Sequence, residues 1–212
     1  MTTLPRLLPP LLGLLLGLSA CASAPTPLPP PSDAVAARVI LAGLSFEPHA
    51  EWVSEALTSN FRVAQYRIPN DEGETAEVVV YHFGPGGAGN MSDNFDRWRG
   101  QFRTAAGDPV EGEVEHSAVD GLMLHALDLS GTWVGETAPG SGEREHRPDY
   151  RMIAVVIGTD AGFYYIKALG PKALLDRWEP AWRAFLGSMR PAPADPPRSV
   201  LRSAPSPSPK RG

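Results

Sequence analysis

Cys21 is the residue whose type and position point to the most specific chemistry. It is the single cysteine of the 212 residues, and it follows Leu18, Ser19 and Ala20. Small residues before a cysteine let a signal peptidase reach the peptide bond, and the thiol can then become a thioether that carries lipid. We therefore expect cleavage before Cys21 and lipidation of this residue. The alternative is an ordinary signal peptide that is cleaved at Ala20 or Ala22.

The residues around Cys21 fit a secreted precursor. Arg6 precedes an apolar run over 7–18, which has about 12 residues and is shorter than the ~20 residues of a membrane-spanning helix. We expect a signal peptide over 1–20 and a lipidated, proline-rich spacer over 21–35. The lipid predicts a lasting membrane anchor on the periplasmic or extracellular face of the cell envelope. Ala22, and not an aspartate, follows Cys21, and in this the chain resembles lipoproteins that are sent to the outer membrane of hosts with two membranes.

The two ends of the mature chain differ in charge from the part between them. The whole chain has a formal net charge of −5 at pH 7, and acidic residues outnumber basic ones over 36–190. The tail over 191–212 is rich in proline, carries a net positive charge and is expected to be disordered. An acidic domain repels nucleic acid, so no nucleic-acid partner is expected.

A glycine-rich run over 84–89 matches the spacing of a phosphate-binding turn, and it follows a strand and precedes a helix. Asp93 and Asp96 lie in the first turn of that helix, where they would repel a phosphate. We therefore interpret the glycines as a sharp turn with positive φ angles, followed by a helix that Asn90 or Ser92 caps. No cofactor is expected.

The histidines and the carboxylates do not show the spacing of a catalytic or metal site. His125 alternates with apolar residues on one strand face, and His82 has a similar setting, so packed histidines are the expected interpretation. Glu111, Glu113 and Glu115 alternate along one strand, too far apart to bind one calcium ion together. No catalytic residue and no metal ligand is predicted.

The segment from Trp133 to Tyr150 is the candidate binding site. It combines aromatic ends with charged residues, and its candidate binding residues are Trp133, Arg144, Arg147, Tyr150 and Arg151. Loops that rigid sheets hold in place often carry recognition, and we expect a polar, mobile loop over 135–149. The alternative is a surface insertion without a binding role.

The hydrophobic pattern over 36–190 predicts a single α+β domain rather than alternating parallel βα units. A sheet of about six or seven antiparallel strands, flanked by helices, is expected. The predicted strands cover 38–46, 61–68, 76–83, 111–119, 121–133, 150–159 and 162–169, and the predicted helices cover 92–103 and 171–189, the second kinked at Pro180.

Two sets of residues resemble known proteins. Leu44-Ser45-Phe46 with Pro48 and Trp52 resembles the opening of the PsbP/Mog1-like domains. The runs 81–89, 97–102 and 150–152 resemble a group of uncharacterised bacterial envelope lipoproteins. The resemblance implies an α/β/α sandwich and a protein-binding role with no common catalytic site. We therefore expect a non-enzymatic module that binds an envelope protein or polymer, and the alternative is a small-molecule-binding protein or hydrolase with a pocket near the glycine-rich turn.

Overall fold

The computed structural model describes residues 31–71, 73–87, 89–136 and 141–194. Cys21, the signal peptide, most of the spacer and most of the tail lie outside these residues. The elements in chain order are β1 (Val39–Leu41), β2 (Leu44–Phe46), β3 (Val53–Ser54), β4 (Arg62–Ile68), β5 (Ala76–His82), α1 (Met91–Arg99), β6 (Phe102–Arg103), β7 (Val114–Val119), β8 (Leu122–Glu136), β9 (Arg144–Thr159), β10 (Gly162–Pro171), α2 (Lys172–Arg177), α3 (Glu179–Gly187) and β11 (Arg190–Pro191).

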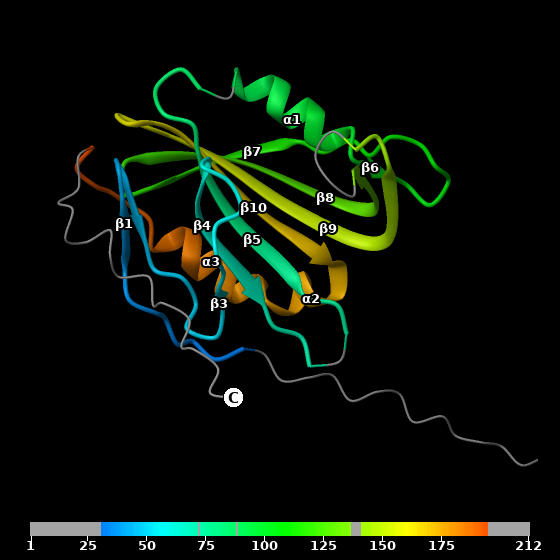
Figure 1. Ribbon diagram of the computed structural model, residues 1–212, viewed down its shortest axis with the longest axis horizontal. Coiled ribbons are helices and arrows are strands. Elements are labelled where there is room, and N and C mark those ends of the chain that lie inside the picture. The colour runs from blue at the N-terminus through cyan, green and yellow to red at the C-terminus, as the bar shows by residue number, and fades with distance from the viewer. Residues whose placement is uncertain (1–30, 72, 88, 137–140, 195–212) are drawn as a thin grey trace, which may run out of the picture.

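An antiparallel sheet of eight strands forms the centre of the domain. Its order is β3-β4-β5-β10-β9-β8-β6, and β7 also pairs with β8. A second sheet of three strands has the order β1-β2-β11. Figure 1 shows α1 on one side of the large sheet and α2 and α3 on the other side. The α+β class with an antiparallel sheet is thus confirmed, although strands contribute more of the fold than expected.

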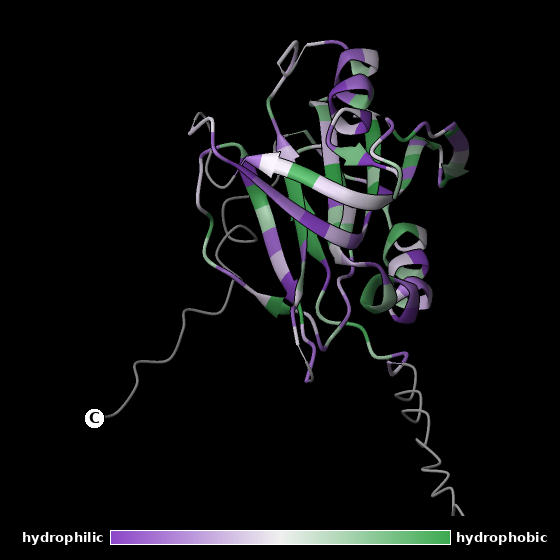
Figure 2. Cartoon of the chain, turned by 90° about the vertical axis from the view of Figure 1, so that its right-hand side faces the viewer, coloured by the Kyte–Doolittle hydropathy of each residue, from purple (hydrophilic) through white to green (hydrophobic). Residues whose placement is uncertain are grey.

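The alternation of side chains along β9 explains why both faces of the sheet are covered. Met152, Ala154 and Val156 pack in the core beneath α1, whereas Ile153 and Val155 pack toward α2 and α3. Successive residues of a strand point to opposite faces, so a continuous apolar run needs a layer on each side. Figure 2 shows green, hydrophobic stretches on the strands of the sheet and both green and purple bands on the helices that cover it.

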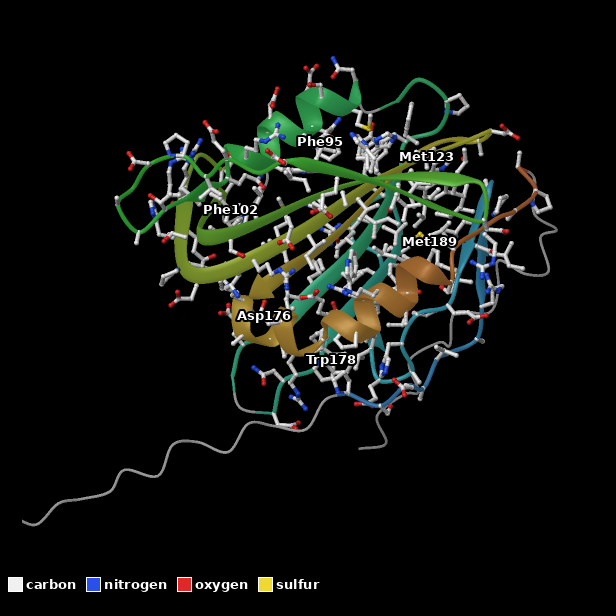
Figure 3. The ribbon with its side chains drawn as sticks, turned by 180° about the vertical axis from the view of Figure 1, so that it is seen from behind. Phe95, Phe102, Met123, Asp176, Trp178 and Met189 are labelled. Atoms are coloured by element: carbon white, nitrogen blue, oxygen red, sulfur yellow. The ribbon has the colours of Figure 1, made fainter. Side chains whose placement is uncertain are left out.

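Each layer of helices contributes large aromatic side chains to its core. The α1 side holds Phe95, Trp98 and Phe102, and the opposite side holds Trp178 and Phe185. Figure 3 shows Phe95 and Phe102 on the side of α1, and Trp178 on the other side of the sheet. No helix within the described ranges is long and apolar enough to cross a bilayer.

Three predicted elements are divided in the structure. The helix predicted over 92–103 ends at Arg99, and Phe102–Arg103 form the short strand β6. The strand predicted over 38–46 is a hairpin of β1 and β2 that turns at Gly43, whose φ is +77°. The helix predicted over 171–189 is two helices, because it ends at Arg177 and restarts at Glu179 with Pro180 in its first turn. Proline has no backbone N–H to donate, so the break falls where the helical hydrogen bonds would otherwise continue.

The packed region extends a few residues beyond 36–190 at both ends. Ala50 N donates to Ala34 O at 3.0 Å, and His49 Nε2 contacts Ser32 O at 2.5 Å. At the other end, Ala192 N donates to Gly43 O at 3.2 Å. These contacts attach both flanking segments to the body of the domain, so the folded part begins near Ser32.

Candidate functional site

The segment that was predicted as a mobile loop is the far end of a long β-hairpin. β8 continues to Glu136, β9 begins at Arg144, and the two strands pair as far as this end. The prediction of a loop over 135–149 is therefore wrong for 135–136 and 144–149, and it is confirmed for 141–143, which lie in no strand. Residues 137–140 lie outside the described residues. The polar residues that suggested a loop lie on a two-stranded ribbon, where both faces tolerate polar side chains.

A β-bulge near Asp149 determines which side chains of this hairpin lie together. Gly131 pairs with Tyr150, and the next pair joins Trp133 to Arg147, so β9 has one extra residue at this point. Asp149 has a φ of +56°, a backbone conformation typical of such a bulge. In a regular strand, Arg147 and Tyr150 would point to opposite faces. The extra residue places both on one face, and Arg147 Nη1 donates to the Tyr150 hydroxyl at 2.8 Å.

A cavity of about 320 Å³ opens beside Arg147 and Tyr150. Its walls come from strands that follow one another across the large sheet, namely β4, β5, β10, β9 and β8. The lining residues are Glu55, Arg67, Thr75, Ala76, Glu77, Trp133, Glu136, Glu145, Arg147, Tyr150 and Leu169. Three of the five candidate binding residues, Trp133, Arg147 and Tyr150, thus belong to one site.

Trp133 and Tyr150 form the aromatic wall of the cavity. Their ring centroids are 6.3 Å apart with an interplanar angle of 23°. The Arg147 guanidinium lies over the Tyr150 ring, with its carbon 5.6 Å from the ring centroid. A cation over an aromatic face is held by the ring quadrupole, so these three side chains support one another.

Ion pairs join charged side chains on both walls of the cavity. Arg147 Nη2 lies 2.7 Å from Glu145 Oε1, and Arg147 also pairs with Glu74, which precedes β5. On the other wall, Arg67 Nε lies 3.1 Å from Glu55 Oε1. The lining contains four carboxylates and two guanidiniums, so it disfavours a polyanionic ligand.

Several groups in the cavity are shielded from water. Burial raises the pKa of the Tyr150 hydroxyl, and the nearby Arg147 opposes this effect only in part. Trp133 Nε1 and Arg147 Nε are buried donors, and neither has a hydrogen-bond partner among the described residues. A buried donor without an acceptor costs about 1–3 kcal/mol, so these two groups lower the stability of this part of the fold.

Gly135 allows the Trp133 side chain to lie flat along β8. A Cβ atom at Gly135 would come within 1.9 Å of the Trp133 ring. We expect Gly135→Ala to displace the indole and to lower the free energy of unfolding by about 1–3 kcal/mol, as measured by urea denaturation. The matched control is Gly187→Ala, where nothing lies within 4 Å of an added Cβ. Equal stability of Gly135→Ala and the wild type would contradict this position for Trp133.

The other two candidate binding residues lie outside the cavity. Arg151 points to the opposite face, where it contacts Asp128 at 2.5 Å, Asp176 at 2.9 Å and Glu179 at 3.0 Å. Arg151 follows Tyr150 directly along β9, so its side chain points to the other face of the sheet. It therefore connects the sheet to the helices on that face. Arg144 is exposed at the tip of the hairpin, where its backbone is paired with that of Glu136 on the neighbouring strand.

The glycine-rich run has the predicted structure. Gly84, Gly86 and Gly89 have φ angles of +73°, +73° and +70°. The Asn90 side chain caps α1 by accepting a hydrogen bond from Asp93 N at 2.8 Å. The interpretation as a turn followed by a capped helix is therefore confirmed.

His82 is packed, as predicted, whereas His125 has a partner that the sequence did not suggest. His82 Nε2 contacts Ala161 O at 2.9 Å, and its ring stacks on Tyr164 with centroids 4.4 Å apart. His125 Nδ1 lies 2.8 Å from Nδ1 of His116 on the neighbouring strand. No group of three or more potential metal-binding side chains occurs in the part of the chain that the structure describes.

Sequence reasoning missed the half of the cavity that comes from β4, β5, β10 and Glu55, which follows β3. Glu55, Arg67, Glu77 and Leu169 lie far from Trp133 in sequence, and nothing in their spacing connects them to it. The curvature of the sheet brings them together. No family model matches the chain, and no curated protein matches it significantly.

Proposed function

We propose that the chain is an envelope lipoprotein, anchored by lipid on Cys21, whose single domain is a non-enzymatic binding module for a protein or an envelope polymer. The residues Leu18, Ser19 and Ala20, which precede Cys21, support the anchor, because small residues there allow cleavage by a signal peptidase. In a two-membrane host the proposed location is the outer membrane, with the domain on the periplasmic or extracellular side. The cavity between the β8–β9 hairpin and β4–β5 is the proposed recognition site.

The observation that carries this proposal is the bulge at Asp149, which gathers Trp133, Arg147 and Tyr150 in one recess. Residues of these three types are enriched at the centres of binding sites, because they combine large apolar area with directed hydrogen bonds.

The alternative, a ligand-binding protein or hydrolase with a pocket beside the glycine-rich turn, has less support. His82 uses its ring in a backbone hydrogen bond and in stacking on Tyr164, so it is poorly placed to transfer protons. Neither His82 nor His125 lines the cavity described above.

The arrangement of helices on both faces of an antiparallel sheet also supports a finer proposal, that the fold is of the PsbP/Mog1-like type. Phe46 and Trp52, which carried the resemblance, both pack against Phe185 of α3, with ring centroids 5.2 Å and 5.4 Å away. They thus have a structural role in joining the small sheet and the following turn to the helical layer.

Site-specific photo-crosslinking of the full-length protein in its native host tests the recognition site. The photoreactive residue replaces Thr75 on the cavity wall, and the control position is Arg183, which is 77% exposed on α3. We expect a specific adduct from position 75 and none from position 183. The same adduct from both positions, or none from position 75, would exclude the cavity as the binding site.

A second variant measures how much the aromatic wall contributes. Trp133→Ala in the position-75 background should reduce the adduct about tenfold or more, because loss of a central aromatic residue commonly costs 2 kcal/mol or more. Phe163→Ala is the matched control, since Phe163 is 41% exposed and lies outside the cavity. Equal losses in the two variants would indicate a nonspecific effect of removing an aromatic ring.

A further inference from the structure

His116 and His125 form a pair of imidazoles on the edge of the sheet that the proposed recognition site does not use. They face each other across β7 and β8, with Nδ1 atoms 2.8 Å apart and ring planes at 82°. His116 is exposed and His125 is half-buried, so both rings are accessible to an ion in solution. We propose that this pair binds one Cu²⁺ or Ni²⁺ ion in a square-planar or tetragonal site.

The nitrogen-to-nitrogen distance is the first reason for this assignment. Two nitrogens that each lie about 2.0 Å from one ion are about 2.8 Å apart when the bonds meet at 90°, and about 3.3 Å apart at the tetrahedral angle. The two Nδ1 atoms lie at a hydrogen-bond distance of 2.8 Å, which also equals the separation of two nitrogens in the right-angled arrangement. Imidazole nitrogens in this geometry are typical ligands of Cu²⁺ and Ni²⁺ rather than of Zn²⁺.

The rigidity of the β7–β8 hairpin is the second reason. Six consecutive pairs join the strands, from Val114↔Leu127 to Val119↔Leu122, and a turn at Asp120 and Gly121 with φ angles of +48° and +83° closes the hairpin. Leu127 is fully buried beneath the α1 layer. Because the backbone already holds both imidazoles in place, little conformational entropy is lost when a metal binds.

The remaining coordination positions are open to solvent. Met123 precedes His125 by two residues on the same face of β8 and is 50% exposed. Its thioether is a soft ligand suited to Cu⁺ and contributes little to Cu²⁺ binding. Water therefore completes the proposed Cu²⁺ site, which predicts modest affinity and exchangeable ligands.

Copper titration of the full chain tests this site. The protein carries Cys21→Ser, so that its single thiol cannot compete, and it has no polyhistidine tag. We expect one equivalent of Cu²⁺, with two nitrogen couplings in the electron paramagnetic resonance spectrum, and binding of Zn²⁺ at least about tenfold weaker. A spectrum without nitrogen coupling, or equal affinity for Zn²⁺, would overturn the assignment.

Three variants locate the ion. His116→Asn and His125→Asn should each weaken Cu²⁺ binding by at least about tenfold, since loss even of a group that only orients a ligand costs that much. His146→Asn changes a single exposed histidine of the other hairpin and should leave binding unchanged. Unchanged binding in the His116→Asn/His125→Asn double variant would exclude this pair, and the spectrum of the unsubstituted pair does not depend on whether the variants fold.

Discussion

Replacing Arg151 by alanine is expected to lower the free energy of unfolding by about 2–3 kcal/mol at neutral pH. The Arg151 side chain is 11% exposed, and it donates three hydrogen bonds to Asp128, at 3.0, 3.2 and 2.5 Å. It also reaches Asp176 and Glu179. Its removal leaves three carboxylates close together without their cation. The carboxylates are themselves partly exposed, so water compensates for part of the loss. Urea denaturation of both proteins measures the difference.

The loss should depend on pH in a defined direction. The hydrogen bonds from Arg151 and then from Arg183 lower the pKa of Glu179 below its usual 4.5. A lowered carboxyl pKa contributes stability that is fully present above the unfolded value and is lost as the pH falls through the folded one. The difference between wild type and Arg151→Ala should therefore be largest at pH 7 and should shrink below about pH 4.5.

Arg183→Ala is the matched control for the Arg151 variant. Arg183 also pairs with Glu179, at 2.5 Å, but its side chain is 77% exposed. An exposed pair of this kind contributes about 0.5 kcal/mol or less. Equal losses in the two variants would show that the contacts of Arg151 to the helices do not stabilise the domain beyond a surface ion pair.

Replacing Cys21 by serine is expected to abolish incorporation of labelled palmitate. Cys21 is the only cysteine, so no other thiol can form the thioether. Residues 1–20 should also remain attached, because the lipoprotein-type cleavage requires the modified cysteine, and the variant should migrate as a longer chain. Two or three acyl chains bind at about 0.8 kcal/mol per buried methylene, so the wild type should stay in the membrane fraction after an alkaline wash.

The control for this experiment is Ser23→Ala, which changes a small residue just after the cysteine and should keep the label. Mass spectrometry of the wild-type N-terminus gives the decisive result. A lipid-free N-terminus at Cys21, or at a residue produced by cleavage near Ala22, would identify an ordinary signal peptide and exclude the lipid anchor.

The sequence determined the features that depend on near neighbours in the chain. Asn90 capped the predicted helix, and the glycines before it adopted the predicted positive φ angles, because both effects act over a few residues. The apolar run over 152–157 of β9 is packed on both faces of the sheet, as a continuous apolar strand needs. The boundaries were less accurate, since Gly43 divided the strand predicted over 38–46. The helix predicted over 171–189 with a kink at Pro180 is interrupted at Trp178.

Only the tertiary structure decided which of the candidate residues share a site. The pairing of β9 with β8 sets the faces to which Arg147, Tyr150 and Arg151 point. One extra residue at Asp149 shifts this pairing, so that Arg147 shares a face with Tyr150 and not with Arg151. That pairing depends on the partner strand β8 and not on the residues of β9 alone. For the same reason, the sequence could list Arg147 and Arg151 together, but only the paired strands could place one in the cavity and the other against the helices.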